Sequence, residues 1–164
     1  MKKLFSVLAV LFVMGTTSIF ALGIGAQAGY TAGSNHAGGA LTFKLDKSPA
    51  IFAVDGNFWS NGFNVGATAD YWLANPKIES TWGYFYGVGL AAGVGVYNDA
   101  NDISVDLGPR AVVGTNIFLL DRFVELYAQA AWQPTFRIWV SGANSGVDPN
   151  LVCFPVNLGF RFWF

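Results

Sequence analysis

The decisive stretch of the sequence is Phe154-Pro155-Val156-Asn157-Leu158-Gly159-Phe160-Arg161-Phe162-Trp163-Phe164. Large apolar side chains occupy every second position, and small or polar residues with one arginine take most of the positions between them. Successive side chains of a β-strand point to opposite faces, so one face of this segment is apolar and the other carries the charge. The pattern predicts a strand with one side toward lipid and the other toward a polar interior.

The same two-residue period recurs in seven runs upstream. The clear ones cover residues 63–73, 84–97, 105–114 and 124–133, and the weaker ones cover residues 24–30, 41–45 and 51–58. Eight such runs predict an all-β fold, an eight-stranded antiparallel transmembrane up-and-down β-barrel, which is the smallest usual size for a single-chain bacterial barrel. Closure pairs every strand edge, and hydrocarbon cannot solvate an unpaired edge.

The composition agrees with a membrane location. Of 164 residues, 53% are hydrophobic and 16% aromatic but only 12% charged, against roughly 25% charged in a typical soluble protein. A soluble fold this poor in charge could not cover its surface, whereas lipid accommodates the apolar excess. The net charge of −1, without a basic cluster beyond Lys2 and Lys3, argues against a nucleic-acid partner.

Residues 1–21 have the three zones of a secretory signal peptide: basic Lys2-Lys3, an apolar run and a small polar end. We expect cleavage after Ala21, which leaves residues 22–164 as the barrel domain. The run Ala26-Gln27-Ala28 is a competing site, but cleavage there would remove most of a well-patterned strand. A retained membrane helix is the alternative, although the apolar run is shorter than the roughly 20 residues that a helix needs to span a bilayer.

An even strand number places both ends of the chain on one side of the membrane, the periplasm in this class. The inner turns are then residues 46–49, 75–82 and 120–122, and the outer loops are residues 33–39, 60–62, 98–102 and the long 134–152. Aromatic residues near these borders predict girdles at the two membrane interfaces. They are Trp59, Tyr71, Trp72, Trp82, Tyr84, Phe85, Phe118, Phe123 and Trp132.

Several motifs together resemble the small OmpA-like and OmpW-like outer membrane barrels, particularly the short barrels of spirochaetes. They are Gly39-Ala40-Leu41-Thr42-Phe43-Lys44-Leu45, Ala69-Asp70-Tyr71-Trp72-Leu73, Tyr86-Gly87-Val88-Gly89, Asp106-Leu107-Gly108-Pro109-Arg110, Glu125-Leu126-Tyr127-Ala128-Gln129 and residues 157–164. The resemblance implies a bacterial outer membrane location. It also implies that Phe160, Phe162 and Phe164 form the signal read by the barrel assembly machinery, and that the peptidoglycan-binding domain of longer OmpA-type proteins is missing.

The inward parity predicts a network of charges within the lumen, because an eight-stranded barrel is just wide enough to be filled by side chains and buried charges need partners. Three positive and four negative residues share this parity: Lys44, Asp55, Asp70, Asp106, Arg110, Glu125 and Arg161. No pair has the setting of a catalytic nucleophile and base, so we expect no enzyme.

No cofactor or metal ion is expected either. The glycines of residues 87–93 resemble a dinucleotide fingerprint, but they share one strand parity and lack the strand-turn-helix context, so close packing explains them better. His36 has no ligand partners at suitable spacing and is read as a loop histidine. Cys153 is the only cysteine and is read as a small apolar residue.

Three functions remain open. The first is a structural or surface-interaction barrel with a largely occluded lumen. Its wall would contact outer membrane lipid, and loop residues Phe136, Ile138 and Trp139 would contact external ligands. The second is a narrow OmpW-like channel for small or apolar solutes, suggested by the glycine-rich inner face of residues 87–95. The third is a soluble lipocalin-like exported barrel, in which the apolar parity would point inward.

Overall fold

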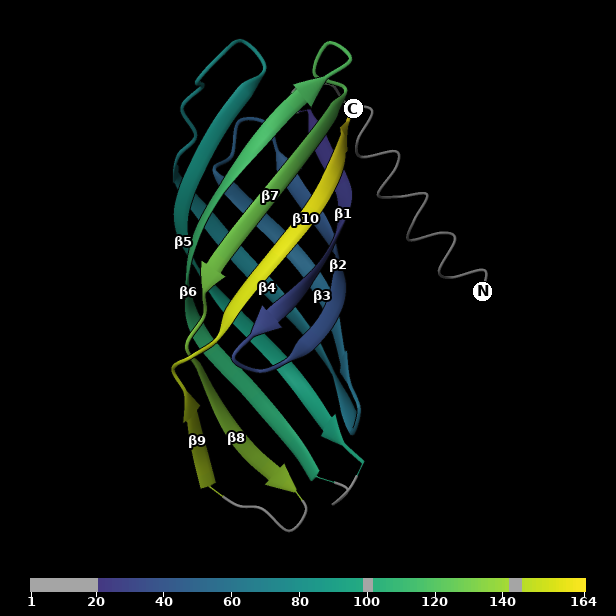
Figure 1. Cartoon of the computed structure of the whole chain (residues 1–164), viewed down its shortest axis with the longest axis vertical. Coiled ribbons are helices and arrows are strands. Elements are labelled where there is room, and N and C mark those ends of the chain that lie inside the picture. The colour runs from purple at the N-terminus through teal and green to yellow at the C-terminus, as the bar shows by residue number, and fades with distance from the viewer. Residues whose placement is uncertain (1–20, 99–101, 142–145) are drawn as a thin grey trace, which may run out of the picture.

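The computed structural model describes residues 21–98, 102–141 and 146–164, which contain ten β-strands (Figure 1). The strands are β1 (Leu22–Ala32), β2 (His36–Leu45), β3 (Ala50–Trp59), β4 (Gly62–Ala74), β5 (Trp82–Tyr97), β6 (Asp102–Leu119), β7 (Val124–Trp132), β8 (Thr135–Ser141), β9 (Gly146–Asn150) and β10 (Phe154–Trp163). No helix in these ranges has the length and apolarity needed to cross a membrane. Residues 1–20 lie outside the described ranges, so the signal peptide stays a prediction.

Eight of these strands close into the predicted antiparallel barrel. Each of β1 to β7 pairs with its neighbour in sequence, and β10 closes the ring by pairing with both β1 and β7. The strands are tilted against the long axis, and the β8–β9 hairpin projects from the lower end of the barrel (Figure 1). We call this end the hairpin end, and the opposite end, where the chain passes from β6 to β7, the turn end.

The expected loop over residues 134–152 is wrong, because most of it forms the β8–β9 hairpin. The strand β8 lies alongside Ile103 to Leu107 of β6 and so continues the course of β7. Pro134 separates the two strands because it has no N–H to donate to a ladder. The alternation of apolar and polar residues resumes directly beyond it, at Phe136.

Two smaller boundaries also differ from the sequence analysis. The loop predicted for residues 33–39 is only a turn at residues 33–35, because Ala37, Gly38 and Gly39 already pair with β1. The strand β6 extends beyond the predicted residues 105–114, since both of its ends find partners in β5. A turn at residues 120–122 is confirmed, and its three residues all adopt the left-handed conformation, with φ between 52° and 73°.

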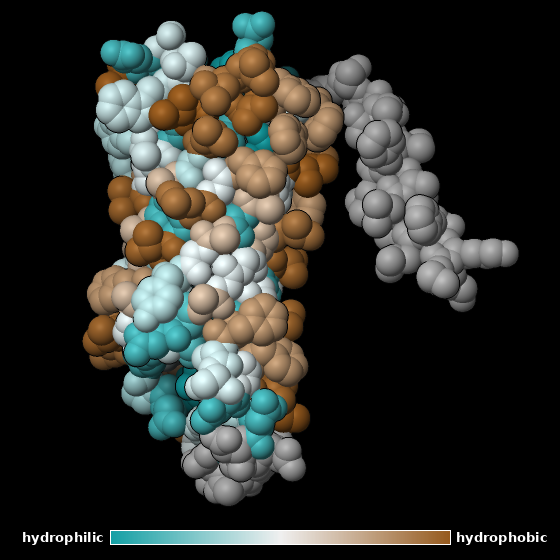
Figure 2. Space-filling model, turned by 45° about the vertical axis from the view of Figure 1, so that its right-hand side comes forward, coloured by the Kyte–Doolittle hydropathy of each residue, from teal (hydrophilic) through white to brown (hydrophobic). Residues whose placement is uncertain are grey.

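The apolar parity lies on the outside of the barrel, as predicted. Leu158 and Leu126 are 67% and 44% exposed, whereas Arg161 and Glu125 on the opposite parity are 1% and 0% exposed. Figure 2 shows apolar side chains over much of the wall of the barrel, with polar residues gathered at the hairpin end. A wall of this kind suits hydrocarbon. The soluble lipocalin-like alternative is therefore contradicted, because it needed the apolar parity inside.

Four of the aromatic residues assigned to the girdles belong to the interior instead. Trp72 and Phe85 are buried and stacked on each other, while Trp59 and Phe118 line interior cavities. The assignment was wrong because it used only their nearness to strand ends and ignored parity: Trp72, for example, shares its parity with Asp70. The other five predicted girdle residues are exposed, as a girdle requires: Tyr71, Trp82, Tyr84, Phe123 and Trp132.

Candidate functional site in the barrel interior

The most deeply buried charges lie in the half of the barrel nearer the turn end. Arg161 on β10 and Glu125 on β7 are direct neighbours in the strand register, and the Arg161 Nη1 to Glu125 Oε2 distance is 3.1 Å. Asn116 Nδ2 donates to Glu125 Oε1 over 2.8 Å, and Trp163 Nε1 donates to Oε2 over 3.2 Å. One fully buried carboxylate thus accepts from three different side chains, which offsets much of its desolvation.

Aromatic rings surround this ion pair and fill the lumen. The guanidinium of Arg161 lies 4.0 Å from the centroid of the Tyr127 ring. Trp72 and Phe85 stack with their centroids 3.9 Å apart. Lys44 Nζ lies 5.1 Å from the centroid of Trp72, within the range of a cation–π interaction. We call the group of Lys44, Trp72, Phe85, Asn116, Glu125, Tyr127, Arg161 and Trp163 the plug.

Glycines on the inward parity make room for the large side chains of the interior. A Cβ added at Gly114 would overlap the Phe85 ring, and one added at Gly159 would overlap the Tyr127 ring. At Gly89 it would overlap the Asp70 carboxylate. These glycines therefore do not border free space: each accommodates a side chain from a neighbouring strand. Close packing therefore accounts for glycine at these three positions.

A second buried ion pair lies farther toward the hairpin end. Arg110 on β6 donates through Nε to both carboxylate oxygens of Asp70 on β4, at 2.9 and 3.1 Å. Its Nη1 donates to Gln133 Oε1 over 2.6 Å. Both charged side chains are at least 94% buried. The two residues are 40 positions apart in the sequence, and only the closed ring of strands brings them together.

The third interior ion pair includes a residue that the sequence analysis missed. Arg137 on β8 donates to both oxygens of Asp106 on β6, over 3.0 and 3.2 Å. Arg137 had been assigned to an outer loop, although its position between Phe136 and Ile138 continues the strand alternation and could have identified it. Asp55, by contrast, forms none of these pairs, and its carboxylate accepts a hydrogen bond from Asn57 Nδ2 over 2.6 Å.

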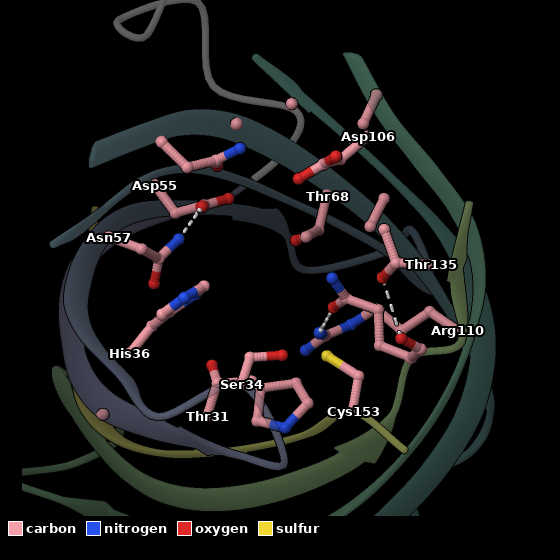
Figure 3. Close-up of a pocket in the computed structure, with 18 of the residues that line it drawn as sticks. Thr31, Ser34, His36, Asp55, Asn57, Thr68, Asp106, Arg110, Thr135 and Cys153 are labelled. Carbon is pink, nitrogen blue, oxygen red and sulfur yellow. Dashed lines mark hydrogen bonds between the residues drawn. The ribbon is translucent and has the colours of Figure 1, made fainter. Parts of the chain in front are cut away.

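Two cavities lie on either side of the plug. The hairpin-end cavity is lined by residues of several strands, among them His36, Asp55, Arg110 and Cys153, whose side chains point into a common space (Figure 3). The turn-end cavity lies against plug residues such as Lys44. It has a volume of about 160 Å³. No residue lines both cavities. The plug residues between the two cavities are almost fully buried, among them Phe85, Tyr127 and Arg161.

His36 and Cys153 both face the hairpin-end cavity. His36 is the first residue of β2 rather than a loop residue, and its ring stacks on Trp59 with the centroids 4.2 Å apart. Cys153 lies between β9 and β10 and is 5% exposed, and burial raises the pKa of its thiol. Within the described part of the chain, no three His, Cys, Asp or Glu side chains are grouped so that they could hold a metal ion.

The remaining residues singled out from the sequence, except Trp139, lie on the outside. Phe136 and Ile138 of β8 are exposed, whereas Trp139 is half-buried and donates from Nε1 to Asp148 on β9 over 2.8 Å. Phe160, Phe162 and Phe164 are exposed on the apolar wall at the turn end.

Comparison with known proteins supports the fold. The structure is similar to that of Neisserial surface protein A, with a TM-score of 0.55 and 16% sequence identity over 88% of this chain and 97% of that one. A major outer membrane protein from Thermus thermophilus aligns with a TM-score of 0.44 and 11% identity over 89% of this chain and 100% of that one. No family model and no curated protein sequence matches. The chain has the fold of a small outer membrane β-barrel.

Proposed function

We propose that this small outer membrane barrel serves as a membrane-anchored surface scaffold with a lumen closed by the plug. One observation carries the proposal: a layer of almost fully buried side chains lies between the two cavities. The layer between them consists of rings and ion-paired groups that are almost fully buried, among them Phe85, Glu125 and Arg161. An ion crossing this layer would have to displace stacked rings and break a buried ion pair.

The surface role is supported by the β8–β9 hairpin, which projects beyond the ring of strands (Figure 1). Phe136, Ile138 and Val140 on β8 are 46%, 40% and 63% exposed. The hairpin is tied to the barrel through the ladder between β8 and β6 and through the Arg137–Asp106 ion pair. A rigidly held hairpin is a suitable element for contact with an external partner, because little conformational entropy is lost when it binds.

The narrow-channel alternative loses its original motivation. It rested on space left by glycines, yet the space beside Gly89 is occupied by the Asp70 carboxylate. A Cβ at Gly93 would lie only 2.9 Å from the amide of Asn64. Polar side chains thus lie close to both Gly89 and Gly93.

Conductance in planar bilayers tests the proposal. We expect purified, folded protein to give no reproducible ion current, because the plug occludes the lumen. A Trp72→Ala/Phe85→Ala variant, which removes the stacked rings, should conduct. Heat-dependent gel migration would verify that both proteins are folded. Steady currents from the wild-type protein would refute a closed lumen.

A further inference from the structure

The hairpin-end cavity contains one carboxylate without a direct counter-charge, that of Asp55. Asp55 lies on β3, is only partly buried, and accepts a hydrogen bond from Asn57 Nδ2 over 2.6 Å. No lysine or arginine of the described residues lies within ion-pair distance of it, whereas each of the other ion-paired acids of the interior has its own arginine. This difference separates Asp55 from the structural ion pairs.

The charges around the cavity do not cancel. Arg110 and Arg137 line it, but Arg110 is paired with Asp70 and Arg137 with Asp106. Once these two pairs are set aside, the carboxylate of Asp55 leaves one net negative charge. Walls of low dielectric strengthen the field of an uncompensated charge and raise the local concentration of ions of opposite sign. The cavity is therefore suited to a monovalent cation.

The size and lining of the cavity narrow the class of ligand. It offers about 110 Å³ to the centres of water-sized molecules, whereas a single water needs roughly 10–15 Å³ measured in this way. Several waters or one small organic molecule would fit. Hydroxyl and amide side chains line the cavity, and Asp55, Asn57 and Thr68 point into the same space (Figure 3). Because Asn57 donates through Nδ2, its Oδ1 remains an acceptor.

We propose that this cavity binds a small organic monocation with N–H donors, of the alkylguanidinium or alkylammonium class. The cationic group would pair with the carboxylate of Asp55, and its other N–H groups would donate to the surrounding amide and hydroxyl oxygens. A divalent metal ion suits the cavity less well, since a single free carboxylate supplies too little charge and no three-residue ligand cluster occurs in the described ranges. The proposal does not depend on whether the lumen conducts.

Calorimetric titration of the detergent-refolded full barrel with methylguanidinium at low salt tests the site. We expect saturable binding with one site per chain. Asp55→Asn keeps the size of the side chain but removes its charge, and should weaken binding by at least about tenfold. The matched control is Glu79→Gln, which removes an exposed carboxylate at the turn end and should leave the affinity unchanged. Heat-dependent gel migration verifies that both variants are folded.

Two further titrations define the ligand class. Methylurea has nearly the same shape as methylguanidinium but no charge, and should bind at least about tenfold more weakly. Potassium chloride at the same ionic strength should compete poorly, because potassium has no N–H groups. Equal affinity of wild type and Asp55→Asn, equal binding of methylurea, equal competition by potassium, or no saturable binding of methylguanidinium would each overturn the proposal.

Discussion

The strongest mutational test concerns Glu125, the only carboxylate of the plug. Glu125→Gln keeps the size and one oxygen of the side chain but removes the charge. Arg161, which is 1% exposed, and Lys44, which is 8% exposed, would then lie in the plug without a compensating anion. Because Arg161 lines neither cavity and cannot reach water without disturbing the barrel, we expect a large loss of stability.

The size of the expected stability loss follows from the burial of the Glu125–Arg161 ion pair. Removing one partner of a buried ion pair costs about 3–5 kcal/mol, since the remaining charge stays desolvated. The complete burial of Glu125 and its three donors place it in this range. A Glu125→Gln/Arg161→Met variant removes both charges and should recover at least about 2 kcal/mol of that loss. The exposed pair of Asp46 and Arg122, 3.7 Å apart, is the matched control, and Asp46→Asn should cost less than about 1 kcal/mol.

Urea unfolding of the barrel in lipid vesicles, followed by tryptophan fluorescence and by gel migration without boiling, measures these differences. The reasoning is refuted if Glu125→Gln unfolds within about 1 kcal/mol of the wild type. It is also refuted if the double variant is as unstable as Glu125→Gln, because the cost would then not come from an uncompensated charge.

Three further predictions follow from packing and exposure. Leu158→Arg, which places a charge on the apolar wall, should cost about 2–4 kcal/mol in vesicle unfolding, and a negligible cost would contradict a lipid-facing position. Gly159→Ala should lower the free energy of unfolding by about 1–3 kcal/mol, because the added methyl group overlaps the Tyr127 ring. The control is Gly56→Ala, where the nearest atoms to an added methyl group are 3.7 Å away, and its stability should change little. The Cys153 thiol should react with a maleimide much more slowly in the folded than in the unfolded protein at pH 8, because it is buried and its raised pKa lowers the thiolate fraction; equal rates would show that the thiol is accessible.

The errors of the sequence analysis have a common origin. The strand predicted from the sequence ends before Pro134. In the structure β6 continues past this position, so strand pairing with β6 resumes in β8. Arg137 was missed for the same reason. Trp72 and Phe85 were placed at the membrane interfaces although their parity points inward. In each case the expectation rested on a local feature, a proline or nearness to a strand end. The two-residue period would have predicted the observed position.

The sequence by itself determined the number of barrel strands and the face on which each side chain lies, because the alternation of a strand is a local property that needs no knowledge of its neighbours. Only the tertiary structure decided which inward side chains meet. Register and closure place Arg110 against Asp70 and Arg161 against Glu125, and they leave Asp55 without a counter-charge. Such pairings depend on the relative stagger of strands that are distant in sequence, and the residues of a single strand do not encode that stagger.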